Sequence, residues 1–219
     1  GDGNVSYITD VNDPILTEYT YAEPGIYQIR LYGRCDHIRF NNAGDKDKVI
    51  SIDQWGDVKW KDMEGSFYGC VNILSIPDGP ITGRDPEFNF IPTALKNTLR
   101  GLSSLSQPIP ANLFADLQGA TQLSGTLQAS GFTGNIPEQL LWGMTELTYP
   151  AFAPFCTGLT GVIPSLLYRD ASKVTSMAGA WDGCSGLTGI GSGLYDNMPL
   201  VTTFADTHRN NIGLTGALP

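Results

Sequence analysis

The chain has 219 residues, with 13 basic and 22 acidic side chains, 26 glycines and 14 prolines, and a formal net charge of −9. So few basic residues argue against binding to nucleic acid or to anionic membrane surfaces, because both need clustered Lys and Arg. So many helix-breaking residues argue against a helical bundle. No apolar run reaches the 18 residues that suggest a membrane-spanning helix, so we expect a turn-rich and β-rich chain without membrane insertion.

The first 54 residues read as a small β region. The start, Gly1 to Asn4, has neither Met nor the features of a secretion signal, which suggests a processed or cloned fragment. Runs of strand-forming residues separated by turn-forming residues occupy 15–21, 26–32, 37–40 and 49–52. An immunoglobulin-like sandwich needs about 100 residues, so residues 1–54 are too few for one. We therefore predict a small antiparallel β region that caps the following repeats, in preference to an independent domain.

From residue 55 onward the sequence repeats itself about every 27 residues. The tripeptide Phe/Leu-Thr-Gly begins at 132, 159, 187 and 214, and Ile-Pro pairs begin at 109, 136 and 163. Two rows of large side chains share the period: Leu113, Leu140, Leu167 and Leu194, and then Phe114, Leu141, Tyr168 and Tyr195. A 27-residue unit cannot bury an apolar face alone, but stacked units can, with each row covering its neighbour. The period therefore predicts a solenoid over residues 55–219.

Two local features complete the predicted repeat. The segment 138–142 follows an Ile-Pro pair and is expected to form one short helix or 3₁₀ turn. Glycines 134, 161, 189 and 216 end the recurring tripeptides, where a backbone with positive φ would suit a turn.

The pattern resembles the bacterial BspA-like leucine-rich-repeat surface proteins. The residues that carry the resemblance are the segments 67–70 and 181–184, each Phe/Trp-x-Gly-Cys, the spacing from Trp60 to Met63, and the opening 55–60. The recurring Leu-Thr-Gly-x-Ile-Pro is also similar to repeats of plant extracellular receptors, but those have a shorter period and an asparagine ladder. The resemblance implies a mainly β, leucine-rich-repeat-like solenoid with short helical turns over residues 55–219, capped by the N-terminal antiparallel region of residues 1–54.

Residues that could carry chemistry are few and scattered. Cys70, Cys156 and Cys184 share one repeat position, which favours buried thiols over disulfides, although their pairing stays open. His208 falls at an aromatic repeat position, where a packed side chain is the simpler interpretation. The segment 10–13 is rich in oxygen ligands and could bind Ca²⁺ or form a turn before Pro14. We expect no metal, cofactor or catalytic site, and no enzyme.

Aromatic side chains are the better candidates for binding. Trp142, Tyr149, Tyr168 and Tyr195 occur at near-equivalent places in successive repeats, and amphipathic aromatics in a row can bind protein or glycan. The alternative is that Tyr168 and Tyr195 continue the core row of Phe114 and Leu141. Trp142 lies one residue beyond that row, which makes it the best candidate for an exposed contact residue.

The function that follows rests largely on the resemblance. It implies a non-enzymatic binding or adhesion module, extracellular and displayed on a bacterial surface or virion, that contacts a host protein or glycan. One alternative is a structural or assembly domain of a phage tail or fibre, as a homo-oligomer or part of a larger assembly. A second alternative is a carbohydrate-active enzyme. Exposed aromatics favour binding, an apolar patch on the last repeat favours assembly, and a cleft with convergent carboxylates favours the enzyme.

Overall fold

The computed structural model describes residues 19–31, 34–35, 37–56, 58–60, 62–81 and 93–215. The chain divides into two compact units, Gly1–Tyr32 and Gly33–Pro219. In the first unit the described residues are irregular, and the rings of Tyr21 and Tyr27 stack with their centroids 3.8 Å apart. The expected division between residues 54 and 55 concerns where the repeats begin and stays a prediction.

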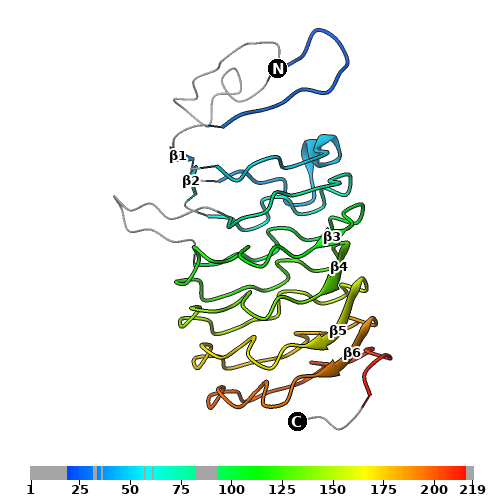
Figure 1. The fold of residues 1–219 in the computed structure, drawn as a ribbon. Helices are drawn as coiled ribbons and strands as arrows, with labels where there is room; N and C mark the ends of the chain where they lie inside the picture. The colour runs from blue at the N-terminus through cyan, green and yellow to red at the C-terminus, as the bar shows by residue number, and fades with distance from the viewer. Residues whose placement is uncertain are drawn as a thin grey trace. The chain divides into compact units, whose positions relative to one another are not determined.

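The second unit contains short strands that pair in parallel (Figure 1). β3 (Gln107–Pro108), β4 (Phe132–Asn135), β5 (Leu159–Ile163) and β6 (Leu187–Ile190) form a four-stranded sheet in that order. β1 (Arg34–Cys35) pairs with β2 (Lys59–Trp60) in a separate two-stranded sheet. The helical content of the described residues is one 3₁₀ segment, η1 (Gly44–Lys48).

The register of this pairing follows the sequence period only in part. Val162 lies opposite Gly189, one period later, whereas Gly134 lies opposite Leu159, two residues short of a period. Isolated parallel bridges join Gln122 to Tyr149 and Ser176 to Thr203, in each case one period apart. These bridges join equivalent residues, and together with the strand pairs they lay each repeat of the second unit along the next (Figure 1).

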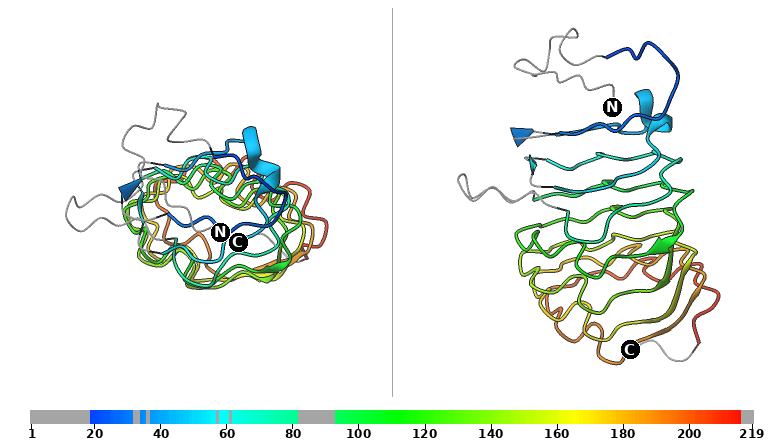
Figure 2. Two further views of the ribbon diagram at one scale, coloured as in Figure 1. Left: turned by 90° about the horizontal axis from the view of Figure 1, so that it is seen from above. Right: turned by 45° about the horizontal axis from the view of Figure 1, so that its top comes forward.

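The core lies inside the ring that each repeat of the second unit makes when it is viewed from above (Figure 2). The leucine row is buried, at 0–2% exposure: Leu113, Leu140, Leu167 and Leu194. Phe114, Leu141 and Tyr168 of the second row are also at most 1% exposed, whereas Tyr195 is half-buried. Stacked apolar rows are therefore what holds the repeats together.

The expected fold class is wrong. The described residues are mostly turns and irregular backbone rather than mainly β, and the repeats carry strands of only two to five residues instead of the strands of a leucine-rich-repeat-like solenoid. The segment 138–142 forms turns, not a helix. β3 ends at Pro108, which has no backbone N–H to donate, and the β5–β6 pairing shifts register between Gly161, with positive φ, and Val162.

The N-terminal antiparallel β region is also wrong for the described residues. The predicted runs 26–32, 37–40 and 49–52 contain no antiparallel pairing there, and 15–18 lie outside the description. Instead β1 pairs in parallel with β2, and Ser51 bridges Ser75 in parallel. From residue 34 the chain already pairs with the segment that follows about one repeat later.

Glycines serve the fold in two ways. Gly134 and Gly161 have φ of +77°, as the sequence predicts, whereas Gly189 does not have positive φ and Gly216 lies outside the described residues. A second row was not predicted: Gly131, Gly158, Gly186 and Gly213. A Cβ on Gly158 would lie 2.6 Å from the carbonyl oxygen of Phe132, so this row lets one repeat approach the backbone of the previous one.

Candidate functional site

The most structured surface cluster is built around Trp142 and Arg169, which lie one repeat apart. The indole Nε1 of Trp142 donates a hydrogen bond to the carbonyl oxygen of Leu166 at 3.0 Å. The guanidinium carbon of Arg169 lies 3.7 Å from the centroid of the Trp142 ring, a cation–π contact. Trp142 is half-buried, so it is more enclosed than the sequence predicts, and one face of its ring is covered.

Asp170 holds this cluster in place through two hydrogen bonds. Its Oδ2 accepts hydrogen bonds from the backbone N–H of Gly143 at 2.8 Å and from Nε of Arg169 at 3.1 Å. The Gly143 N–H is the main reason that the pKa of the Asp170 carboxyl is lowered. Asp170 is therefore ionised at neutral pH and ties two repeats together beside the exposed guanidinium, whose side chain is 42% exposed.

The other three aromatic candidates are more engaged in the fold. Tyr168 is 1% exposed and belongs to the core, as the alternative interpretation predicts. Tyr149 is half-buried, and its hydroxyl donates to the carbonyl oxygen of Ala178 at 2.8 Å. The structure brings together only Tyr168 and Tyr195, whose rings stack at 6.5 Å, and no ring contact joins either of them to Trp142 within the described residues.

Tyr195 also contacts one of the two histidines. Its hydroxyl oxygen lies 2.7 Å from Nε2 of His208, and burial raises the pKa of Tyr195. Burial lowers the pKa of His208, and its Nδ1 is buried without a hydrogen-bond partner in the described part of the chain. His208 is thus a packed, neutral side chain near pH 7 rather than an exposed base.

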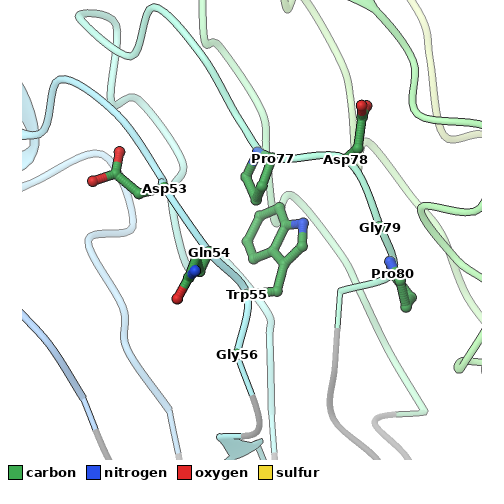
Figure 3. Close-up of a pocket in the computed structure, with 8 residues that line it drawn as sticks. All are labelled: Asp53, Gln54, Trp55, Gly56, Pro77, Asp78, Gly79 and Pro80. Carbon is green, nitrogen blue, oxygen red and sulfur yellow. The ribbon is translucent and has the colours of Figure 1, made fainter.

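A recess of about 420 Å³ is lined by residues 53–56 and 77–80 of the second unit (Figure 3). Its floor is the indole of Trp55, which is 8% exposed, with Pro77 against one side and the Gly79–Pro80 backbone on the other. Asp53 and Asp78 lie on its rim, but their carboxylates point in different directions (Figure 3). This arrangement does not resemble the facing carboxylates that glycoside hydrolysis uses.

The sequence reasoning missed two surface features that the period could have revealed. Arg169 lies one repeat beyond Trp142, so the same arithmetic that aligns the leucines places these side chains side by side. A threonine row also follows the period: Thr121, Thr148, Thr175 and Thr202 donate their hydroxyls to the carbonyls of Thr93, Thr121, Thr148 and Thr175. With their protons engaged, these hydroxyls offer only acceptor oxygens and methyl groups to a ligand.

Three of the four cysteines are structural. Cys70, Cys156 and Cys184 are buried free thiols, and burial raises the pKa of Cys156 to about 12 and that of Cys184 to about 11. Both thiols donate to a carbonyl of the preceding repeat, Leu127 and Ala153 respectively. Thiols that stay protonated at neutral pH are poor nucleophiles and metal ligands.

No group of three His, Cys, Asp or Glu side chains that could hold a metal ion occurs among the described residues. The possible Ca²⁺ segment 10–13 lies outside them. None of the described helices is long and apolar enough to cross a membrane.

Comparison with known proteins gives no family. No protein-family model matches this chain, and no curated protein matches it. The resemblance to BspA-like proteins therefore stays a prediction. The function has to be argued from the surface of the second unit.

Proposed function

We propose that the protein is a non-enzymatic binding module that contacts a partner protein or glycan through the surface around Trp142 and Arg169. The observation that carries the proposal is the exposed Arg169 guanidinium stacked on Trp142 and held by Asp170. Trp and Arg are the residues that most often dominate binding energy at interfaces. Side chains that are fixed before binding lose less conformational entropy when the partner arrives.

The scaffold supports this role. The second unit orders its repeats by buried apolar rows, and its surface carries neutral polar groups such as the threonine row as well as ion pairs such as Lys173 to Glu146 at 2.6 Å. A surface of hydroxyls and backbone-fixed side chains offers hydrogen bonds without a strong charge of either sign. We further propose, from the resemblance of the repeats, that the module is displayed on a bacterial surface or a virion.

Replacing Trp142 with Ala is expected to reduce partner binding at least tenfold, because it removes the platform that positions Arg169. The stability loss should stay near 1 kcal/mol, since one hydrogen bond to Leu166 and a half-buried ring are lost. The measurement is a glycan and surface-protein binding screen, followed by affinity and thermal melting of both proteins.

The matched control is Trp142→Phe, which keeps a smaller aromatic ring to contact Arg169 and loses the indole N–H with its hydrogen bond to Leu166. It should retain most of the binding. Unchanged binding by Trp142→Ala in a screen that identifies a ligand would move the binding surface elsewhere.

A second candidate function, assembly with a further copy of the chain, is favoured by the last described repeat. Phe204 is 47% exposed although Met177, one repeat earlier, is fully buried, and Leu200 and Ile212 are 53% and 89% exposed. If copies associate through these side chains, the protein will show a concentration-dependent mass above 23.6 kDa by light scattering. Phe204→Ser should then restore the monomer mass, and a wild type that is monomeric at high concentration would exclude this interface.

A further inference from the structure

We infer that Arg169 is the receptor for the carboxylate of an acidic sugar within an otherwise neutral glycan. The inference rests on the proposed binding function and adds the chemistry of the ligand. It follows from which guanidinium atoms are used, from what surrounds them, and from the charge of the whole chain.

The first step is the geometry of the guanidinium. Among the described residues the side chain of Arg169 hydrogen-bonds through Nε alone, and one face of its guanidinium lies on the Trp142 ring. Its two terminal nitrogens are left with N–H groups that point away from Nε in one plane. This fork matches the two oxygens of a carboxylate, which an ammonium group does not do.

The second step is that the fork is held ready. Trp142 is anchored by its hydrogen bond to Leu166, and Asp170 is anchored by the Gly143 N–H, so both supports of Arg169 are themselves fixed to the backbone. The Asp170 carboxylate contacts the guanidinium at Nε and also accepts the hydrogen bond from the Gly143 N–H. Lys173, the nearest basic residue in the sequence, has its ammonium group engaged by both oxygens of Glu146. Arg169 is also paired, with Asp170, but only through Nε, so its terminal nitrogens remain for a second carboxylate.

The third step concerns the competing carboxylate one repeat later. Asp196 occupies the position that follows Trp142 and Arg169 in the period, yet it makes no ion pair with Arg169. Its carboxylate instead lies over Gly193, where an added Cβ would be 2.8 Å from Oδ2. The guanidinium leans toward the preceding repeat, so an external carboxylate has access to it.

The fourth step selects the ligand. A chain of net charge −9 repels polyanions and acidic protein surfaces at long range, but it tolerates a single carboxylate on a neutral body. The residue whose carbonyl anchors Trp142, Leu166, is 46% exposed, and Trp142 is half-buried, so the cluster offers apolar surface for the C–H face of a sugar ring. A glycan that is neutral except for one acidic sugar satisfies both requirements.

The test compares two sugars that differ only in the carboxylate, methyl glucuronide and methyl glucoside, by NMR titration of the Trp142 indole N–H. We expect the glucuronide to bind at least about tenfold more tightly, with the preference reduced in high salt. Arg169→Gln should abolish the preference, and Arg169→Lys should restore only part of it. Lys173→Gln removes the same charge four residues away and should leave the preference intact.

The outcomes separate this inference from the proposed function. Equal affinity for the two sugars, retention of the preference by Arg169→Gln, or full affinity in Arg169→Lys would each overturn the carboxylate fork. Binding of an acidic peptide but of no carboxylated sugar would overturn the glycan while leaving a protein-binding module. If the folded wild type binds no glycan and no protein in the wider screen, both this inference and the proposed binding function are overturned.

Discussion

Replacing Leu167 with Ala is expected to lower the free energy of unfolding by about 2–5 kcal/mol. Leu167 is fully buried, and its row continues through Leu140 and Leu194 in the neighbouring repeats. Removing its isopropyl group leaves a cavity that the stacked repeats cannot close without shifting the backbone hydrogen bonds between them. The measurement is urea unfolding of both proteins, with the midpoint and slope determined separately.

The matched control for this prediction is the residue beside it. Leu166 is 46% exposed, so Leu166→Ala removes the same atoms from the surface and should change stability by less than about 1 kcal/mol. A comparable loss for the two variants would mean that the 27-residue register assigns inside and outside wrongly. A change in the unfolding slope for Leu167→Ala alone would show that the repeats unfold in separate steps.

The sequence predicts which residues meet, and it does not predict what backbone they adopt. The leucine row is buried because a fixed period brings equivalent residues of successive repeats together, whatever the local conformation. The strands are shorter than the sequence predicts: β3 ends at Pro108, and the β5–β6 pairing shifts register beside Gly161. Backbone pairing depends on these interruptions, which apolar periodicity does not register.

The candidate site was predictable in part for the same reason. The period places Trp142 one residue beyond the core row and allows Tyr168 to belong to that row. The same period places Arg169 one repeat after Trp142, but composition and net charge describe the whole chain and do not indicate this contact. The recess over Trp55 depends on how Pro77 and Pro80 close around the indole, and no spacing in the sequence indicates such a closure.

Replacing Gly186 with Ala is expected to destabilise the protein by about 3 kcal/mol or more, as overpacking against a rigid neighbour does. The φ angle of Gly186 is not in the left-handed region, so alanine could adopt the local backbone. The obstacle is the preceding repeat: a Cβ would lie 2.9 Å from the carbonyl oxygen of Thr157 and closer still to that of Leu159. Backbone atoms cannot move aside as a flexible side chain could.

Gly179 separates this steric effect from the conformational one. It has φ of +66°, but an added Cβ would meet no atom within 4 Å, so Gly179→Ala should cost only about 1–2 kcal/mol through strain. Because Gly186 directly precedes β6, its variant should also lose amide-exchange protection along β5 and β6, which Gly179→Ala should keep. If Gly186→Ala cost less than Gly179→Ala, the close approach of repeats along the glycine row would be wrong, and the row would need another explanation than backbone contact.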